Sequence, residues 1–181
     1  SFLLWTCINK GESYFTNRRL WLTVFLYSLT FTALYLLMSY FYTGNTFLFS
    51  ELDSRAYERY SFRMKDMSFI DAITYISHVW EFDDWGAPMS MALFLKMVPY
   101  KLFVNFCYII LSTLCALMLY SIGRTLKMTR KYAYMAALSY ATASYTMFFL
   151  GSYLKEEILC FLVIASFYLL YRYYKSQNLL S

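Results

Sequence analysis

The feature that most constrains the fold is an uninterrupted apolar run near the start of the chain. It extends from Leu20 to Thr43 and carries no charged side chain over its 24 residues. At 1.5 Å per residue, a helix of that length is longer than the roughly 30 Å hydrocarbon core of a bilayer. We therefore expect a first membrane-spanning helix at residues 20–43.

Three further apolar runs predict spanning helices at residues 102–122, 132–151 and 158–174. The whole chain is 60% hydrophobic and 15% charged, whereas soluble domains are nearer half apolar and a quarter charged. We expect an all-α, polytopic membrane protein with about four transmembrane helices that form one membrane domain over residues 1–181. Because the chain starts at Ser1 and stops just after an apolar run, we expect it to be part of a longer protein.

The distribution of charge predicts the orientation of these helices. Four spans would put residues 1–19, 123–131 and 172–181 on one side, which holds nine of the sixteen basic residues and, of the acids, only Glu12. The positive-inside rule makes that side cytoplasmic, together with both ends of the chain. The basic residues stand at the ends of apolar runs as topology determinants, so we expect membrane lipids and no nucleic acid as partners.

The interval from residue 44 to 100 is the expected external loop. Eight of the eleven acidic residues lie between Glu51 and Met91, with the only histidine, His78. The patterns at 54–65 and 68–80 predict amphipathic helices on the membrane surface. Gly86 and Pro88 predict a turn. A half-buried helix should then lead into the next span, with a bend at Pro99.

Candidate site residues gather at the outer ends of the spans. Asp53 could act as a general base or could cap the following helix. Arg55, Arg59 and Arg63 share a helix face, which could hold a phosphate or pair with acids and lipid headgroups. The remaining features have plain readings: His78 is a lone interfacial histidine, and the cysteines are small apolar residues (Cys7, Cys107, Cys115 and Cys160).

Two further acidic groups allow more than one interpretation. Asp83 and Asp84 could form an ordinary turn, position an acceptor, or bind a divalent cation, for which oxygen ligands favour Mg²⁺, Mn²⁺ or Ca²⁺. Lys155 and Glu156, in a polar turn at residues 152–157, could be a solvated helix end or part of a site. No cofactor is required by the sequence.

Several of these segments together resemble the N-terminal part of GT-C-type glycosyltransferases. The resemblance rests on Asp53 and Tyr57 as a D-x-x-x-Y start to a long external loop, and on a loop exit that contains Asp83, Asp84, Trp85, Gly86 and Pro88. Lys155-Glu156 at the outer end of a later helix is also similar. Members of the group, such as protein O-mannosyltransferases and aminoarabinose transferases, take a sugar from a polyprenyl-phosphate carrier. Ser54 follows Asp53 here, where family members usually carry an Asp-Glu pair.

The resemblance implies roles for individual residues. Asp53 would deprotonate the acceptor as it attacks the anomeric carbon with inversion, and the acceptor would be a lipid, a protein or a glycan. Arg55 and Lys155 would hold the polyprenyl phosphate that leaves. Tyr57, Asp83, Asp84, Trp85 and Glu156 would contact substrate. The implied location is a bacterial inner or plasma membrane, with the site on the outer face.

Two other functions stay open at this point. One is a non-enzymatic assembly or transport subunit whose acidic external loop docks a partner. The other is a different polyprenyl-lipid enzyme, such as a polymerase or ligase of surface polysaccharide. A transporter should carry charges near the middle of its spans, whereas the four apolar runs here are nearly free of charge.

Overall fold

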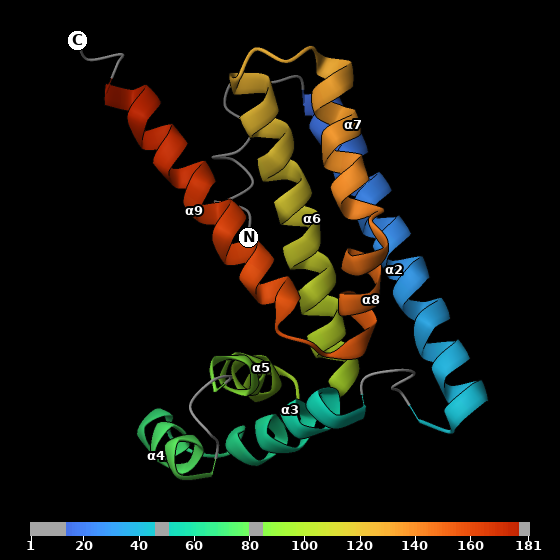
Figure 1. Ribbon diagram of the computed structural model, residues 1–181, viewed down its shortest axis with the longest axis vertical. Helices are drawn as coiled ribbons and strands as arrows, with labels where there is room; N and C mark the ends of the chain where they lie inside the picture. Colours follow the sequence, from blue (N-terminus) through green and yellow to red (C-terminus); the bar gives the residue numbers. More distant parts are fainter. Residues whose placement is uncertain (1–13, 46–50, 80–84, 178–181) are drawn as a thin grey trace.

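The computed structural model describes residues 14–45, 51–79 and 85–177, and within these ranges all regular structure is helical. Its long helices are α2 (Tyr14–Thr43), α6 (Lys101–Thr125) and α9 (Glu156–Gln177). Each contains a segment long and apolar enough to cross a membrane. The prediction of an all-α chain is confirmed, as are the helices expected at 20–43, 102–122 and 158–174. Figure 1 shows these helices extending away from a layer of shorter ones.

The single helix expected at 132–151 is wrong, because the segment forms two helices. α7 (Arg130–Ala141) and α8 (Ser144–Ser152) are separated at Thr142 and Ala143, where Ala143 is extended. The Thr146 hydroxyl donates a hydrogen bond of 3.0 Å to the Tyr140 carbonyl across this break. Together α7 and α8 return the chain from the far end of α6 to the start of α9 (Figure 1).

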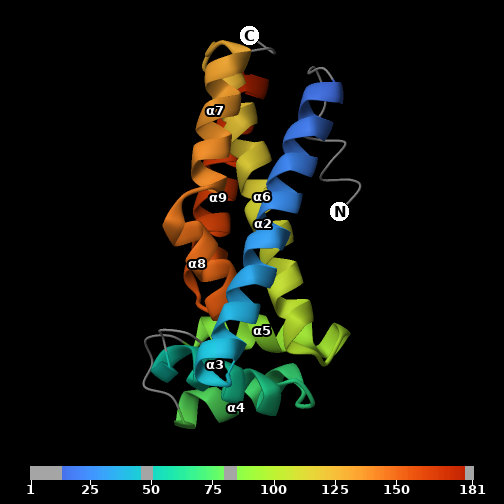
Figure 2. The ribbon, with the colours of Figure 1, turned by 90° about the vertical axis from the view of Figure 1, so that its right-hand side faces the viewer.

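The expected external loop contains a layer of three short helices at one end of the bundle (Figures 1 and 2). They are α3 (Glu51–Met64), α4 (Phe69–Val79) and α5 (Gly86–Met97). The two amphipathic helices and the helix that leads into the second span are confirmed. The turn expected over residues 81–88 is described only from Trp85, which lies in a turn. Gly86 and Pro88 instead lie in the first turn of α5, where proline is tolerated because it lacks an N–H that would have no helical partner.

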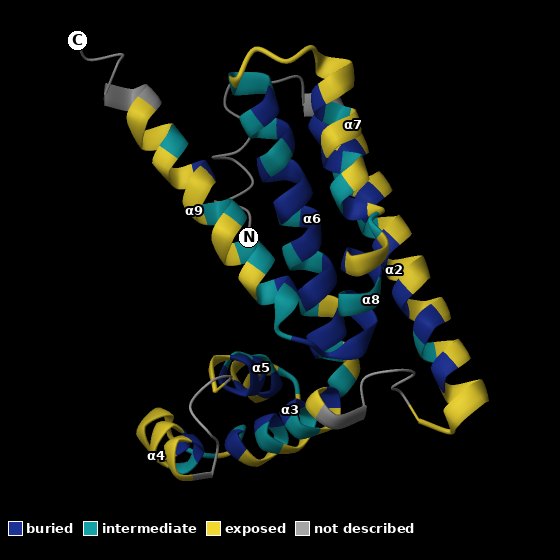
Figure 3. Ribbon diagram, viewed as in Figure 1, coloured by how far each residue is buried: buried dark blue, intermediate teal, exposed yellow. Residues whose placement is uncertain are grey.

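Helix α6 is the central element of the bundle and packs against α2, α7 and α9. Figure 3 shows it as the most extensively buried of the long helices. On α7, Ala133, Ala137 and Ala141 are fully buried at four-residue spacing, a row of small side chains that permits close approach to α6. A Cβ atom added at Gly123 would stand 3.2 Å from the Cβ of Ala133, so the two helices nearly touch there.

Two further apolar clusters join the short helices to the bundle. One contains Tyr57 of α3, Leu95 of α5 and Tyr108 of α6, and it continues into the α8–α9 connection. The other lies within the layer and holds α3, α4 and α5 together through Met64, Ile76 and other buried side chains. The layer is therefore packed against the lower end of α6 and has its own small core.

The contact between α2 and α8 depends on the absence of a side chain at Gly151. A Cβ atom there would overlap the ring of Tyr35, which is itself buried. We expect Gly151→Ala to lower the free energy of unfolding by about 1–3 kcal/mol, because the helices must move apart. Thermal unfolding of the purified protein in detergent would measure the change. Gly86→Ala is the matched control, since a Cβ at Gly86 has no neighbour within 4 Å. Equal melting temperatures for the two variants would contradict the close packing.

Candidate functional site

The connection between α8 and α9 is the point where the predicted site residues meet the rest of the fold. Tyr153 takes a left-handed conformation with φ of 64°, which ends α8 and redirects the chain toward α9. The Asn105 side chain of α6 donates a hydrogen bond of 2.7 Å to the Leu150 carbonyl. The Ser54 hydroxyl of α3 donates to the Ser152 carbonyl. Helices α3 and α6 thereby hold the connection from two sides.

Lys101, the first residue of α6, adds a charged link at the same place. Its Nζ lies 3.5 Å from a carboxylate oxygen of Glu58 on α3 and 5.4 Å from the centre of the Tyr153 ring. Burial raises the pKa of the Tyr153 hydroxyl above its ordinary value, so the ring remains neutral over the physiological range. The ion pair and the cation–π contact fix α3 against the connection.

Asp53 directly precedes Ser54 in the sequence, and its side chain is exposed. It is the third residue of α3, so the helix begins before it, and the expected role as the residue that precedes and caps the helix is wrong. Its side chain is exposed, whereas the neighbouring Ser54 is fully buried against the α8–α9 connection. Asp53 is thus carried by a helical turn that packs against the α8–α9 connection through Ser54, while its own side chain stays exposed.

The other predicted residues of α3 fall on two different faces. Tyr57 is 1% exposed and packs in the apolar cluster with Leu150 and Tyr153. Arg55 and Arg63 are exposed, and Arg63 donates a hydrogen bond of 3.1 Å to the Tyr75 hydroxyl of α4. Tyr57 accordingly holds α3 in position. Of the three arginines on α3, Arg63 is bound to α4 within the layer of short helices.

The loop exit is described only from Trp85 onward; Asp83 and Asp84 lie outside the described residues. Trp85 is 39% exposed and immediately precedes α5. Among the residues that the structure describes, no group of three or more histidine, cysteine, aspartate or glutamate side chains could hold a metal ion. The predicted divalent cation therefore stays a prediction about residues 83 and 84.

A groove of about 360 Å³ lies between the start of α5 and the start of α9, and we call it the α5–α9 groove. Gly86, Ala87 and Ser90 line one wall, and the other consists of Lys155, Ile158, Leu159 and Leu162. Leu159 and Leu162 are about half exposed. The groove thus joins one cation to an apolar surface that continues along α9. Gly86 and Lys155, which are far apart in the sequence, thus line the same groove.

Two adjacent carboxyl groups follow Lys155 and point in different directions. Glu156 is partly exposed, although its Oε2 is buried, whereas Glu157 is only 1% exposed and faces α6 and α7. The hydroxyls of Ser112 and Tyr140 lie next to the Glu157 carboxyl, but among the described residues neither makes a hydrogen bond of normal geometry with it. A glutamate that is buried among helices in this way is costly to retain.

Sequence reasoning missed the importance of Glu157 and Lys101. A doublet of glutamates at the start of an apolar helix was a usable signal, because successive residues on a helix point about 100° apart and the two carboxyl groups therefore meet different surroundings. No such signal existed for Lys101, whose partners come from α3 and from the α8–α9 connection. Comparisons with protein-family models, with curated proteins and with solved structures found no match for this chain.

Proposed function

We propose that this chain belongs to a membrane glycosyltransferase that takes a sugar from a polyprenyl-phosphate donor. The observation that carries the proposal is the α5–α9 groove. Its apolar wall suits an isoprenoid chain, and Lys155 at its polar end suits the phosphate that the chain carries. Trp85 immediately precedes Gly86, a lining residue of the groove, and is 39% exposed, so its ring is available to stack on a sugar.

The reaction would be a single displacement at the anomeric carbon of the donor sugar. The Asp53 carboxylate accepts the proton of an acceptor hydroxyl while the acceptor oxygen forms its bond to the anomeric carbon. The bond between that carbon and the phosphate oxygen breaks, and its electron pair leaves with the polyprenyl phosphate. Lys155, with Arg55 as a second cation, offsets the charge on the leaving phosphate. Because there is one displacement, the anomeric configuration inverts.

The same proposal includes four membrane crossings with both ends of the chain in the cytoplasm of a bacterial cell. Three crossings are α2, α6 and α9, and the pair α7 and α8 would make the remaining one. A broken crossing is compatible with a bilayer where neighbouring helices surround the break. The layer of α3, α4 and α5 would lie on the outer surface, where the exposed side chains of Phe69, Ile70 and Ile73 can enter the interface.

These exposed apolar side chains of α4 also favour a second candidate function, a membrane subunit that docks a partner protein. An exposed apolar patch on a surface helix can serve either a bilayer or a partner. The two functions differ in whether the α5–α9 groove binds a lipid-linked sugar, so donor binding separates them.

Donor binding is tested with a photoactivatable polyprenyl-phosphate mannose and the protein purified in detergent. We expect Lys155→Gln to weaken binding by about 10- to 100-fold, since a hydrogen bond to a charged group contributes roughly 1.5–3 kcal/mol. Lys65→Gln, which removes an equal charge from the neighbouring layer, should leave binding unchanged. Equal labelling of both variants and the wild type would rule out the groove as the donor site. A wild type that is not labelled at all would favour the docking subunit.

A further inference from the structure

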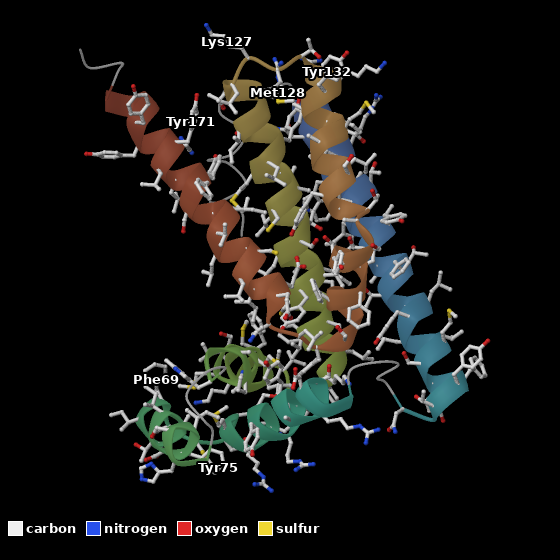
Figure 4. The ribbon with its side chains drawn as sticks, in the orientation of Figure 1. Phe69, Tyr75, Lys127, Met128, Tyr132 and Tyr171 are labelled. Carbon is white, nitrogen blue, oxygen red and sulfur yellow. The ribbon has the colours of Figure 1, made fainter. Side chains whose placement is uncertain are left out.

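A second groove lies between α2 and α7 at the opposite end of the bundle, and we call it the α2–α7 groove. It has a volume of about 530 Å³ and is lined by Arg19, Arg130, Lys131, Tyr134 and Met135. Three of its five lining residues are therefore cations, contributed by two different helices. Figure 4 labels Lys127, Met128 and Tyr132 at this end, with Phe69 and Tyr75 in the layer at the other.

The position of two of these cations is unfavourable for the helix that carries them. Arg130 and Lys131 are the first residues of α7, where the helix dipole has its positive end and disfavours cations. The first turn contains no acidic residue, and the side chain of Thr129 makes no capping hydrogen bond. The backbone N–H groups of this turn and the two side chains therefore all favour a negative charge at the same place.

No described carboxylate supplies that charge. The acidic side chains that the structure describes lie in α3, α4, their connection, and the start of α9, and all of these belong to the opposite end of the bundle. Within the described ranges, none of Arg19, Arg130 and Lys131 forms an ion pair. The electrostatic balance of the groove thus calls for an anion from outside the described chain.

The level of the groove in the bundle indicates which kind of anion it takes. The apolar segment of α2 begins at Asn17 and that of α6 ends at Thr125, so the groove lies where two candidate spans end. Met135 is 52% exposed and extends the groove toward the apolar surface of the bundle. An anion held here is accompanied by apolar side chains on one side, as the phosphate of a lipid headgroup is.

We propose that the α2–α7 groove is a binding site for the phosphate of an anionic membrane lipid. Arg19, Arg130 and Lys131 donate charge-assisted hydrogen bonds to the phosphate oxygens, together with the free N–H groups at the start of α7. Tyr134 and Met135 contact the first carbons of the acyl chains. The site neutralises the cations at the start of α7 and so stabilises the helix that is broken at Thr142 and Ala143. It is independent of the α5–α9 groove.

The site is tested by native mass spectrometry of the whole chain in detergent, titrated with phosphatidylglycerol, with phosphatidylcholine of the same acyl chains, and with glycerol 3-phosphate. We expect phosphatidylglycerol to bind in preference to phosphatidylcholine. Arg19→Gln/Lys131→Gln should weaken phosphatidylglycerol binding by roughly 10- to 30-fold, because each cation near a membrane surface contributes about 1 kcal/mol. The conservative pair Arg19→Lys/Lys131→Arg should retain binding.

The matched control removes two charges from the same end of the bundle without touching the groove. Arg18 and Lys127 are exposed and do not line it. Asparagine suits position 127, where φ is 62°. Arg18→Gln/Lys127→Asn should bind phosphatidylglycerol as the wild type does. Equal losses in the two double variants would overturn the proposal in favour of a general field effect, as would equal binding of the two lipids. Binding of glycerol 3-phosphate without binding of the lipid would overturn the lipid assignment.

Discussion

Replacing Asp53 with asparagine is expected to leave the protein folded and to reduce sugar transfer by about 10²- to 10⁴-fold, the usual contribution of a positioned general base. The side chain is exposed, so its loss should change the free energy of unfolding by no more than about 0.5–1 kcal/mol. Asparagine has nearly the same shape but cannot accept a proton from the acceptor. Transfer is measured from radiolabelled polyprenyl-phosphate mannose with the full-length protein in membranes, and the melting temperature reports folding.

Asp66→Asn is the matched control for this experiment. Asp66 is also exposed and lies in the same layer, just after the end of α3. Its removal changes the net charge by the same amount, so transfer should proceed at the wild-type rate. Unchanged transfer in Asp53→Asn would exclude Asp53 as the base. A similar loss of transfer in both variants would mean that the net charge of the layer, and not a proton transfer to Asp53, controls the rate. If the wild type binds the donor but transfers nothing, the docking function becomes the better account.

The three long helices could be predicted because each requires only a long run of apolar residues. Their ends were less accurate: α2 begins at Tyr14 rather than at residue 20, since Arg18 and Arg19 continue the helix beyond the apolar run. Hydropathy marks where a helix can lie in lipid, and a helix does not have to end where the lipid does. The same reasoning found α3 and α4 from their amphipathic patterns.

The break between α7 and α8 could not be predicted in this way. The segment contains neither proline nor glycine between Ala141 and Ser144, so no residue marks an interruption. Hydroxyl side chains bind backbone carbonyls at the break: Thr146 donates to the Tyr140 carbonyl, and Thr142 donates to the Leu138 carbonyl at 3.0 Å. Such side-chain hydrogen bonds compete with the helical backbone, but they occur equally well inside unbroken helices. The sequence therefore allowed either outcome.

The candidate site was predictable as a list of residues but not as an arrangement. Lys155 was singled out because it stands at the end of an apolar run, and Trp85 because it belongs to the loop exit. That the α5–α9 groove joins these two segments depends on how the layer docks on the bundle, which is decided by contacts distant in sequence. The hydrogen bond from Ser54 to Ser152 and the ion pair between Lys101 and Glu58 are two of them. Neither follows from spacing or periodicity.

Tyr57→Ala is expected to have the largest effect on stability, a loss of about 3–5 kcal/mol in the free energy of unfolding. Tyr57 is 1% exposed and fills the space between α3 and the α8–α9 connection, so its truncation leaves a cavity that the surrounding helices cannot close. Because Ser54 and Glu58 lie on the same face of α3, the hydrogen bond and the ion pair should weaken together with the packing. Chemical unfolding in detergent measures the loss, and limited proteolysis shows whether α3 detaches before the bundle unfolds.

Two substitutions on the same helix determine what the Tyr57 result means. Tyr57→Phe keeps the ring and removes only the hydroxyl, so it should cost no more than about 1.5 kcal/mol. Arg59→Ala truncates an exposed side chain two residues away and should stay within about 0.5 kcal/mol of the wild type. If Tyr57→Ala were as mild as Arg59→Ala, the docking of α3 on the bundle would be wrong. If Tyr57→Phe instead preserved stability but abolished transfer, the Tyr57 hydroxyl would act on the substrate, as the resemblance to the glycosyltransferases implies.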